Sequence, residues 1–439
     1  MSDHPARTPH IVLALVVLAA LASSCARSLP TAANTTAPTR ALANREEGQT
    51  LEGEVAVTLV LGVKPGDVAA SYNATVLEWS YNERVAGFVP GHGETPASLL
   101  AKLIADPRVT TAEANASFQV AEARQKSFAF DDGRNTPDNF TSQPAMAAVH
   151  AIQALAVSRG NGVRVAILDT GIDPDHPLFA GRIGAAYDFV ETREGATELA
   201  YGVDSNHDGY TDGAFGHGTH VAGIVAAVAP GATLLIARVL DSDGQGDVVT
   251  VASGIHWAVT QGADIINLSL GSLTRSTAIS NALAEAQSHG ILVFASAGNW
   301  GTPLPQEWPA RDDAAMAVAA TDAYAAAAPW SSFEPYIVLS APGVAVRSAF
   351  PGGGYRQWSG TSMSTPFVTG TAALLRWRHP NWRRADFVAR LRATATPITG
   401  LLDERVGMFG AGMLDIGAAL APDAPAGDEG TILTPGAHH

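Results

Sequence analysis

The segment GTSMSTP, residues 360–366, places Ser362 between a glycine and an apolar run that begins at Phe367. This pattern predicts a tight turn followed by a helix. Pro366 fits the first helical turn, because its missing N–H would have no intrahelical partner there. A serine at the start of a helix lies beside unpaired N–H groups and the positive end of the helix dipole, which favour a developing negative charge. Taken alone, the segment is better explained as an ordinary helix cap.

Composition limits the class of protein. The chain has 439 residues, 46% hydrophobic and 16% charged, which indicates a globular protein with room for one large and one small domain. The net charge of −15 argues against nucleic acid as a partner. The single cysteine, Cys25, excludes an internal disulfide and thiol catalysis in the folded body.

The N-terminus predicts export from a bacterial cell. In residues 1–25, Arg7 precedes an apolar core at 11–21 that is too short to span a bilayer comfortably. Ala22-Ser23-Ser24-Cys25 resembles a lipoprotein cleavage box, in which Cys25 would carry lipid and anchor the protein to the membrane. A simple secretory signal with an incidental cysteine is the alternative. Residues 26–50 have no apolar periodicity and predict a flexible tether.

Residues 51–122 predict a small α+β domain. Alternating apolar residues from 55 to 61 indicate a half-buried strand, and 75–89 offers two more strand-like runs. Residues 96–104 predict a helix with one apolar face, and 109–120 a last strand. This order of elements suggests a ferredoxin-like sandwich. The polar, turn-rich residues 123–143 predict a linker open to proteolysis.

Residues 144–421 predict an α/β domain with a doubly wound parallel sheet. Residues 163–168 are almost continuously apolar, as in parallel strands covered on both faces. Strand-like and helix-like runs then alternate along the chain, which is the order of such a sheet. The expected strands are 233–239, 264–270, 291–297, 316–320 and 336–341, and the expected helices are 221–228, 248–261, 276–288 and 364–377. Residues 422–439, rich in proline and glycine, predict a disordered tail.

Three more polar residues stand beside glycines at the ends of these elements. Asp169 ends the first strand, His217 opens a helix, and Asn299 follows a later strand. The carboxyl edge of such a sheet is where functional groups collect. With Ser362 they supply a hydroxyl nucleophile, a base, an orienting carboxylate and an amide donor for an oxyanion. Each alone has an ordinary structural explanation, so the argument rests on the set.

This set of motifs resembles the subtilases, the subtilisin-like serine peptidases, over about residues 145–420. The chain order Asp, His, Ser is that of the family. The resemblance implies that Asp169 orients His217, His217 acts as general base, Ser362 is the nucleophile and Asn299 donates to the oxyanion. It implies a serine endopeptidase that works through an acyl-enzyme on protein or peptide substrates, with no cofactor needed for the chemistry; we expect a monomer. The matching motifs are DTGID at 169–173, HGTH at 217–220, SLG at 269–271, SAGN at 296–299 and GTSMSTP at 360–366.

The resemblance also implies how substrate and propeptide bind. Ser269, Leu270 and Gly271, with Ala297 and Gly298, would pair with the substrate backbone as edge strands. Residues 51–122 would be a propeptide that assists folding and then inhibits, because a non-local parallel sheet forms slowly. We expect self-cleavage in the linker 123–143, and a zymogen as the first product of synthesis.

Side-chain specificity is less determined. Trp300 would lie near the primary specificity pocket, or would be an aromatic residue at the edge of solvent. The acids of the segment 241–246 would favour basic residues elsewhere in the substrate.

One segment suggests calcium. Asp204, Asn206, Asp208, Tyr210 and Asp212 alternate around Gly209, like the front half of an EF-hand loop. The glutamate expected at the twelfth position is replaced by Phe215. Aspartate and asparagine are also common turn formers, so a plain turn is the alternative to a structural Ca²⁺ site.

Two rival functions are less consistent with the sequence. A catalytically inactive envelope protein on the same scaffold would have lost at least one of the four groups, and none is missing. A serine esterase of the α/β-hydrolase type requires Gly-x-Ser-x-Gly and the order Ser, acid, His, which this chain does not have.

Overall fold

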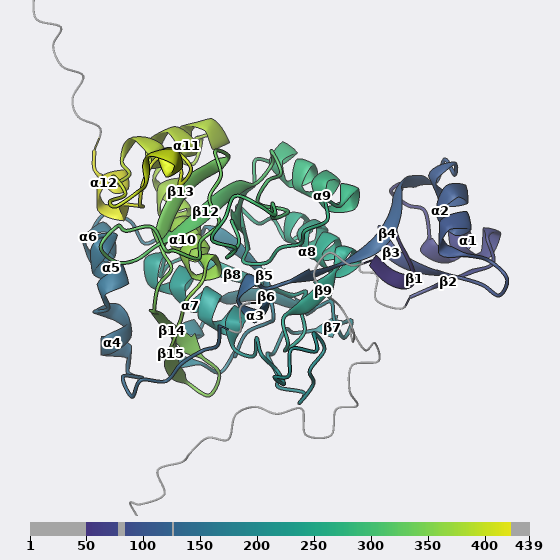
Figure 1. The fold of residues 1–439 in the computed structure, drawn as a ribbon, viewed down its shortest axis with the longest axis horizontal. Helices are drawn as coiled ribbons and strands as arrows, with labels where there is room; N and C mark the ends of the chain where they lie inside the picture. The colour runs from purple at the N-terminus through teal and green to yellow at the C-terminus, as the bar shows by residue number, and fades with distance from the viewer. Residues whose placement is uncertain (1–49, 78–83, 125–126, 423–439) are drawn as a thin grey trace, which may run out of the picture.

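The computed structural model describes residues 50–77, 84–124 and 127–422. The predicted signal segment, Cys25, nearly all of the tether and nearly all of the tail lie outside the described residues. Figure 1 shows a small unit beside a larger α/β body, with strand β4 running from the first into the second. Within the described residues, no helix has the length and hydropathy needed to cross a membrane.

The small unit has the connectivity of a ferredoxin-like sandwich. Its four-strand sheet has the order β2-β3-β1-β4, with antiparallel neighbours throughout. Its core includes Val57, Phe88, Leu99 and Leu103, so the apolar face of α2 packs on the sheet as the sequence predicted. Its elements are β1 Thr50–Leu59, α1 Pro65–Ser71, β2 Ala74–Val76, β3 Val85–Pro90, α2 Pro96–Ile104 and β4 Val109–Gln119.

The large body contains an eight-strand sheet in the order β13-β12-β11-β10-β5-β8-β6-β7. All neighbours are parallel except the last pair, β6 and β7. The strands are β5 Arg164–Asp169, β6 Ile183–Asp188, β7 Arg193–Glu194, β8 Thr233–Arg238, β10 Ile265–Leu268, β11 Leu292–Ser296, β12 Met316–Thr321 and β13 Ile337–Pro342.

Helices cover both faces of this sheet. Along β5, Val165 and Ile167 belong to one apolar core, and Ala166 and Leu168 belong to the other. Because both faces are buried, the four central positions of the strand, 165–168, are all apolar, and this confirms the predicted doubly wound sheet. Helices α7 His217–Val228 and α10 Thr361–Arg378 pack on one face, and α8 Val248–Thr260 and α9 Thr277–Ser288 on the other.

Several elements were not expected from the sequence. Part of the segment 123–143, expected to be an open linker, packs on the body: Phe140 lies in its core, and Arg347 forms an ion pair of 2.6 Å with Asp132. A separate hairpin, β14 with β15, follows the main sheet. The remaining elements are β9 Gln245–Asp247, β14 Val346–Phe350, β15 Gly354–Trp358, α3 Ala121–Arg124, α4 Pro137–Thr141, α5 Pro144–Ala148, α6 Ala151–Ala154, η1 Pro177–Phe179, α11 Arg384–Ala393, η2 Asp403–Arg405 and α12 Ile416–Leu420.

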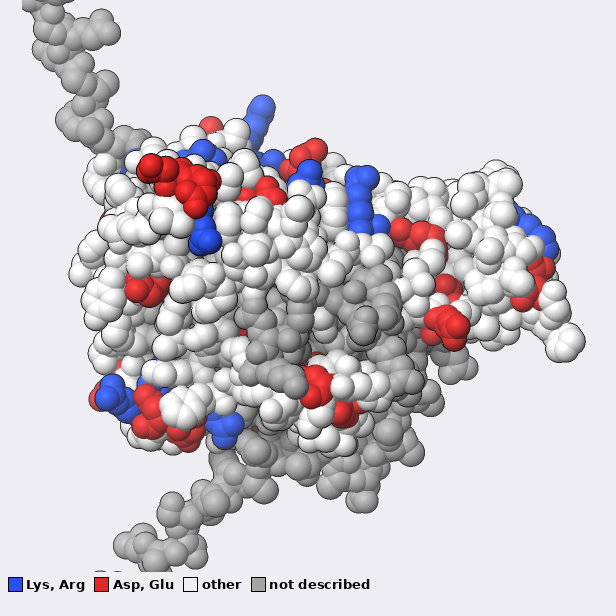
Figure 2. Space-filling model, viewed as in Figure 1, with Lys and Arg blue, Asp and Glu red and all other residues white. Residues whose placement is uncertain are grey.

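The surface agrees with the charge argument. On the face shown in Figure 2, acidic and basic side chains lie in small separate groups over the described residues. An extended basic surface, which a general nucleic-acid binder needs, does not form there.

Candidate active site

The fold brings the four expected residues to one edge of the sheet. Asp169 is the last residue of β5, His217 the first of α7 and Ser362 the second of α10, while Asn299 follows β11. All four side chains are buried. Segments far apart in the sequence therefore meet at the carboxyl ends of parallel strands.

Asp169 and His217 are hydrogen-bonded directly. Asp169 Oδ1 lies 2.7 Å from His217 Nδ1 and also accepts a bond of 2.8 Å from the backbone N–H of Thr170. With Nδ1 directed at the carboxylate, the other ring nitrogen, Nε2, faces the site. This pair has the geometry in which a carboxylate sets the tautomer of a histidine base.

Glu122, which sequence analysis did not identify, fills the centre of the site. Ser362 Oγ donates a hydrogen bond of 2.7 Å to Glu122 Oε2, and His217 Nε2 lies 3.4 Å from the same oxygen. The serine hydroxyl and the imidazole therefore both contact one carboxylate oxygen. In this arrangement the Ser362 hydroxyl donates its hydrogen bond to Glu122 and not to His217.

The second oxygen of Glu122 lies among the amide donors. Asn299 Nδ2 donates to Oε1 at 2.9 Å, and the backbone N–H of Ser362 is directed to it at 3.4 Å. The orientation of the Asn299 amide is fixed, because its Oδ1 accepts from the N–H and the hydroxyl of Thr361 at 3.0 and 2.9 Å. These two donors form an anion-binding position beside the serine.

The charges in the site are coupled. Burial disfavours the imidazolium, but the negative charges of Asp169 and Glu122 outweigh burial and raise the pKa of His217 to about 10. Burial likewise opposes ionisation of Glu122, yet His217 and the donors Ser362 and Asn299 hold its pKa below the usual value. Both shifts favour an imidazolium–carboxylate pair in the full-length chain.

The end of β4 reaches the site as an added strand. Residues Ser117–Gln119 pair antiparallel with β9, and Gln119 exchanges two hydrogen bonds of 2.9 Å with Gly271 on the other side. The predicted edge at 269–271 is thus paired with the chain's own N-terminal unit. Ser269 and the buried Leu270 precede that contact, and Ser269 Oγ donates to the carbonyl of Ser362 at 3.0 Å.

The second predicted substrate edge, Ala297 and Gly298, also borders the site. Ala297 is buried and its N–H pairs with Val318 of β12, while the N–H of Gly298 donates to Thr361 Oγ1 at 3.2 Å. Trp300 is half-buried, and its Nε1 donates a bond of 2.8 Å to Glu307. Glu307 is a second buried glutamate that sequence analysis did not identify.

A third such glutamate, Glu198, holds the catalytic segments together. Its fully buried carboxylate accepts from the N–H groups of Gly216 and Thr219, on either side of His217, at 2.8 and 3.1 Å. It also accepts from the hydroxyls of Thr219 and of Thr170, the neighbour of Asp169. No local pattern in the sequence marks this residue, because its four hydrogen-bond donors belong to three residues, Thr170, Gly216 and Thr219, in two other segments.

The calcium site expected at residues 204–212 stays a prediction. Asp204, Asn206 and Asp208 use side-chain oxygens to accept N–H groups of their own loop, and Asp212 accepts from Tyr201, Gly202 and Ser242. Among the described residues, no group of three His, Cys, Asp or Glu side chains is arranged to hold a metal ion. The contacts within the loop are also those of a plain turn, which is the alternative explanation.

The acids of the segment 241–246, expected to favour basic residues in the substrate, are hydrogen-bonded within the protein. Asp241 accepts N–H groups from Asp243 and Gln245 at 2.9 and 2.8 Å and the hydroxyl of Ser205 at 2.9 Å. Both acids are buried in the loop. They shape the turn before β9.

Comparison with known proteins agrees with this geometry. A model described as the subtilase family matches residues 160–412. Subtilisin NAT from Bacillus subtilis subsp. natto is 38% identical over 272 residues, which cover 59% of this chain and 66%, just under two thirds, of that protein. The thermostable alkaline protease from Halalkalibacterium halodurans is 37% identical over 314 residues, covering 70% of this chain and 77% of that protein.

Two solved structures share the fold. Fervidolysin from Fervidobacterium pennivorans aligns with a TM-score of 0.67 at 24% identity, over 91% of this chain and 65% of that one. A cold adapted subtilisin-like serine proteinase aligns with a TM-score of 0.51 at 29% identity, over 59% of this chain and 90% of that one. The region that the family model matches, residues 160–412, includes Asp169, His217, Asn299 and Ser362. The chain belongs to the subtilase family.

Proposed function

We propose that this chain is a serine endopeptidase, synthesised as a zymogen, that hydrolyses peptide bonds through an acyl-enzyme. The observation that carries the proposal is the 2.7 Å pair of Asp169 and His217, with Ser362 and Asn299 converging on the same carboxylate as His217. All the groups that the reaction needs come from the chain, so the chemistry requires no cofactor.

Each residue has a defined part in the reaction. When Glu122 has left, Ser362 Oγ attacks the peptide carbonyl and His217 Nε2 takes its proton, while Asp169 stabilises the imidazolium. The oxyanion that forms accepts from Asn299 Nδ2 and the N–H of Ser362, the donors now directed at Glu122 Oε1. His217 then gives the proton to the leaving amine, and water hydrolyses the acyl-enzyme by the same route.

The edges beside the site would bind the substrate main chain. Residues 269–271 and β9 together form a slot for an added antiparallel strand, which Ser117–Gln119 fill in the uncleaved chain. Ala297, Gly298 and Trp300 would border the side chain next to the scissile bond. Main-chain pairing supplies affinity that does not depend on substrate sequence, which suits an endopeptidase of protein substrates.

Residues 51–122 would be the inhibitory propeptide. They occupy the substrate slot, and Glu122 separates the nucleophile from the base. Two further contacts hold the unit on the body: Glu113 accepts the N–H groups of Thr277 and Ala278 at the start of α9, and Arg84 pairs with Glu285 at 2.7 Å. Release would follow self-cleavage within 123–143.

The decisive test combines labelling and digestion. A fluorophosphonate probe should label the processed protein at Ser362, and the protein should cleave casein; Ser362→Ala should do neither and should remain full length. Labelling without casein cleavage would favour the esterase, and a protein that binds neither probe nor substrate would favour the inactive scaffold.

We further propose export to the bacterial envelope or medium, with Cys25 as the lipidated residue. The sole cysteine of the chain stands where a lipoprotein cleavage box needs it. In cells fed labelled palmitate, the wild type should incorporate label and Cys25→Ser should not. If both proteins are exported unlabelled, the segment is a simple secretory signal.

A further inference from the structure

Glu307 lies between the two edges that border the active site. Its side chain is 1% exposed. A Cβ added at Gly271 would overlap its Oε2, and a Cβ added at Gly298 would overlap its Cγ. The carboxylate therefore lies against the glycine of each edge and borders the space between the two edges.

That space is where the substrate side chain next to the scissile bond must lie. A carbonyl attacked by Ser362 has its oxygen between Asn299 Nδ2 and the N–H of Ser362, the donors that now hold Glu122 Oε1. Gly298 immediately precedes Asn299, and Gly271 pairs with the strand in the slot. The side chain of the residue contributing that carbonyl, P1, therefore enters between these two glycines and meets Glu307.

The position of the carboxylate is fixed by its surroundings. Glu307 Oε1 accepts from Trp300 Nε1 at 2.8 Å. The next residue, Trp308, exchanges two backbone bonds with Ser272, at 2.8 and 2.9 Å, which ties this segment to the 269–271 edge. Because the Glu307 carboxylate is buried and water screens it little, it interacts strongly with a cation placed beside it.

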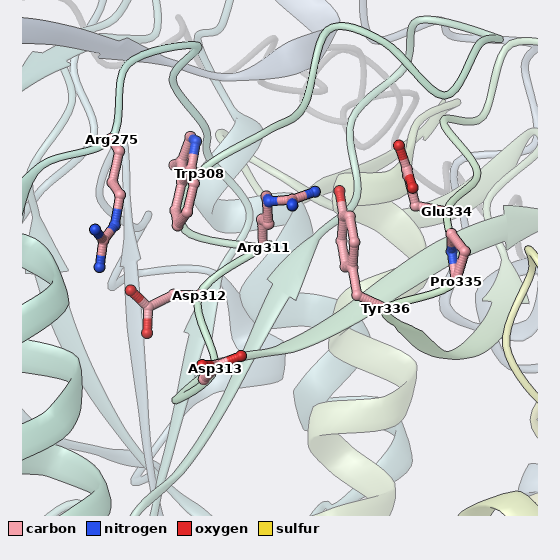
Figure 3. Close-up of a pocket in the computed structure, with 8 residues that line it drawn as sticks. All are labelled: Arg275, Trp308, Arg311, Asp312, Asp313, Glu334, Pro335 and Tyr336. Carbon is pink, nitrogen blue, oxygen red and sulfur yellow. The ribbon is translucent and has the colours of Figure 1, made fainter.

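Two arginines lie close to this segment, each beside an aromatic ring. Figure 3 shows Arg275 beside Trp308 and Arg311 beside Tyr336 in a neighbouring pocket, also lined by Glu334. Their guanidinium groups lie 5.2 and 5.7 Å from those ring centres. Glu334 of this pocket offers a carboxylate away from the two glycine edges, which makes it a matched control for Glu307.

We propose that Glu307 makes this enzyme select arginine or lysine at P1. The inference rests on the proposed peptidase function. It also predicts that self-cleavage in the expected region follows one of its basic residues, Arg124, Lys126 or Arg134. The mature protein is then expected to begin at Gln125, Ser127 or Asn135.

The test uses processed protein, first titrated with a fluorophosphonate to count active sites, and matched peptides that differ only at P1. We expect kcat/KM for arginine and lysine to exceed that for leucine by about tenfold or more. Glu307→Gln, which keeps the size of the side chain, should lower kcat/KM for arginine by about 10- to 100-fold and change that for leucine little. Glu334→Gln, a carboxylate of the neighbouring pocket, is the control and should leave the ratio unchanged.

The outcomes are separable. A wild type that labels and cleaves the leucine peptide better than the arginine peptide overturns the inference and leaves the peptidase function standing; this comparison needs no variant. An arginine-to-leucine ratio equal in wild type and Glu307→Gln also overturns it. A protein that neither labels nor cleaves any peptide removes the proposed function, and the inference with it. N-terminal sequencing that finds a cut after Arg124, Lys126 or Arg134 supports it, and a cut after any other residue contradicts it.

Discussion

Glu122 Oε2 accepts a 2.7 Å hydrogen bond from Ser362 Oγ, so a side-chain carboxylate rather than a peptide carbonyl faces the nucleophile. The other oxygen of Glu122 lies where an oxyanion would bind. A carboxylate cannot be cleaved by the serine, and it is stabilised by the same donors as the transition state. This relationship gives a chemical reason why the full-length chain would be inactive, as the proposed zymogen requires.

Replacing Glu122 should weaken inhibition. Glu122→Ala removes contacts to Ser362, Asn299 and His217, and we expect inhibition by the N-terminal unit to fall about 10- to 100-fold because bonds to a charged group are lost. The measurement is the lag before peptidase activity appears in refolded full-length protein. Glu52→Gln, an exposed residue of β1, is the control. An unchanged lag in Glu122→Ala would mean that strand pairing alone inhibits.

The inhibited state should weaken at alkaline pH. A histidine with a raised pKa stabilises the state that holds it fully below its ordinary pKa of about 6.5, and this contribution disappears as pH rises through the raised value. Because the pKa of His217 is raised to about 10 in the uncleaved chain, processing should accelerate between about pH 7 and pH 10. The lowered pKa of Glu122 gives a contribution that is lost as pH falls instead of as it rises. Acid should therefore release Glu122 from the site only at pH values below the ordinary pKa of a glutamate.

Gel time courses of full-length protein from pH 6 to pH 10 test this expectation, with Glu122→Gln as the comparison. The variant keeps the shape of the side chain and loses its charge, so its processing rate should depend less on pH. A wild-type rate that falls from pH 7 to pH 9 would contradict the coupling of His217 with Glu122.

Asn299→Ala should lower kcat by about 10²–10³ with a smaller change in KM, a magnitude measured in subtilisin, a relative of this chain. The physical reason is that Asn299 Nδ2 donates at the oxyanion position, where charge develops only in the transition state. Steady-state kinetics on processed protein measure both constants, and Asn206→Ala in the surface loop is the control. A loss confined to KM would assign Asn299 to substrate binding.

Glu198 should act as a positioning residue. Glu198→Gln keeps the size of the side chain, but an amide replaces one of the oxygens that accept from Thr170, Gly216 and Thr219. We expect kcat to fall about tenfold or more through misplacement of His217, with little change in KM. Kinetics should be paired with thermal unfolding. Equal kcat with lower stability would show that Glu198 only holds the fold.

Glu113 should strengthen propeptide binding without affecting the mature enzyme. It accepts the first N–H groups of α9, which gain from a negative charge at the helix N-terminus. Glu113→Ala should shorten the lag before activity appears and cost about 1 kcal/mol of the docking free energy. The kcat/KM of processed protein should be unchanged. A slower processed enzyme would contradict a role limited to docking.

The sequence alone determined the parallel sheet and the four catalytic candidates. Residues 165–168 are all apolar because both faces of β5 are buried, and the polar residues that follow such strands pointed to a site only when they were taken as a set. In residues 51–122 the strands and the helix at 96–104 were predicted from their local periods, whereas α1 at Pro65–Ser71 was not.

Only the tertiary structure identified Glu122, Glu198 and Glu307. Each is a glutamate with no local motif, and its role comes from partners more than a hundred residues away or in another segment, such as Ser362 for Glu122 and Gly271 for Glu307. At residues 204–212 the local pattern predicts calcium, and the structure shows the side-chain oxygens of Asp204 accepting N–H groups of the loop while Asp212 accepts from outside it. Local periodicity fixes elements and edges, whereas the chemistry of a buried charge depends on which distant groups the fold places around it.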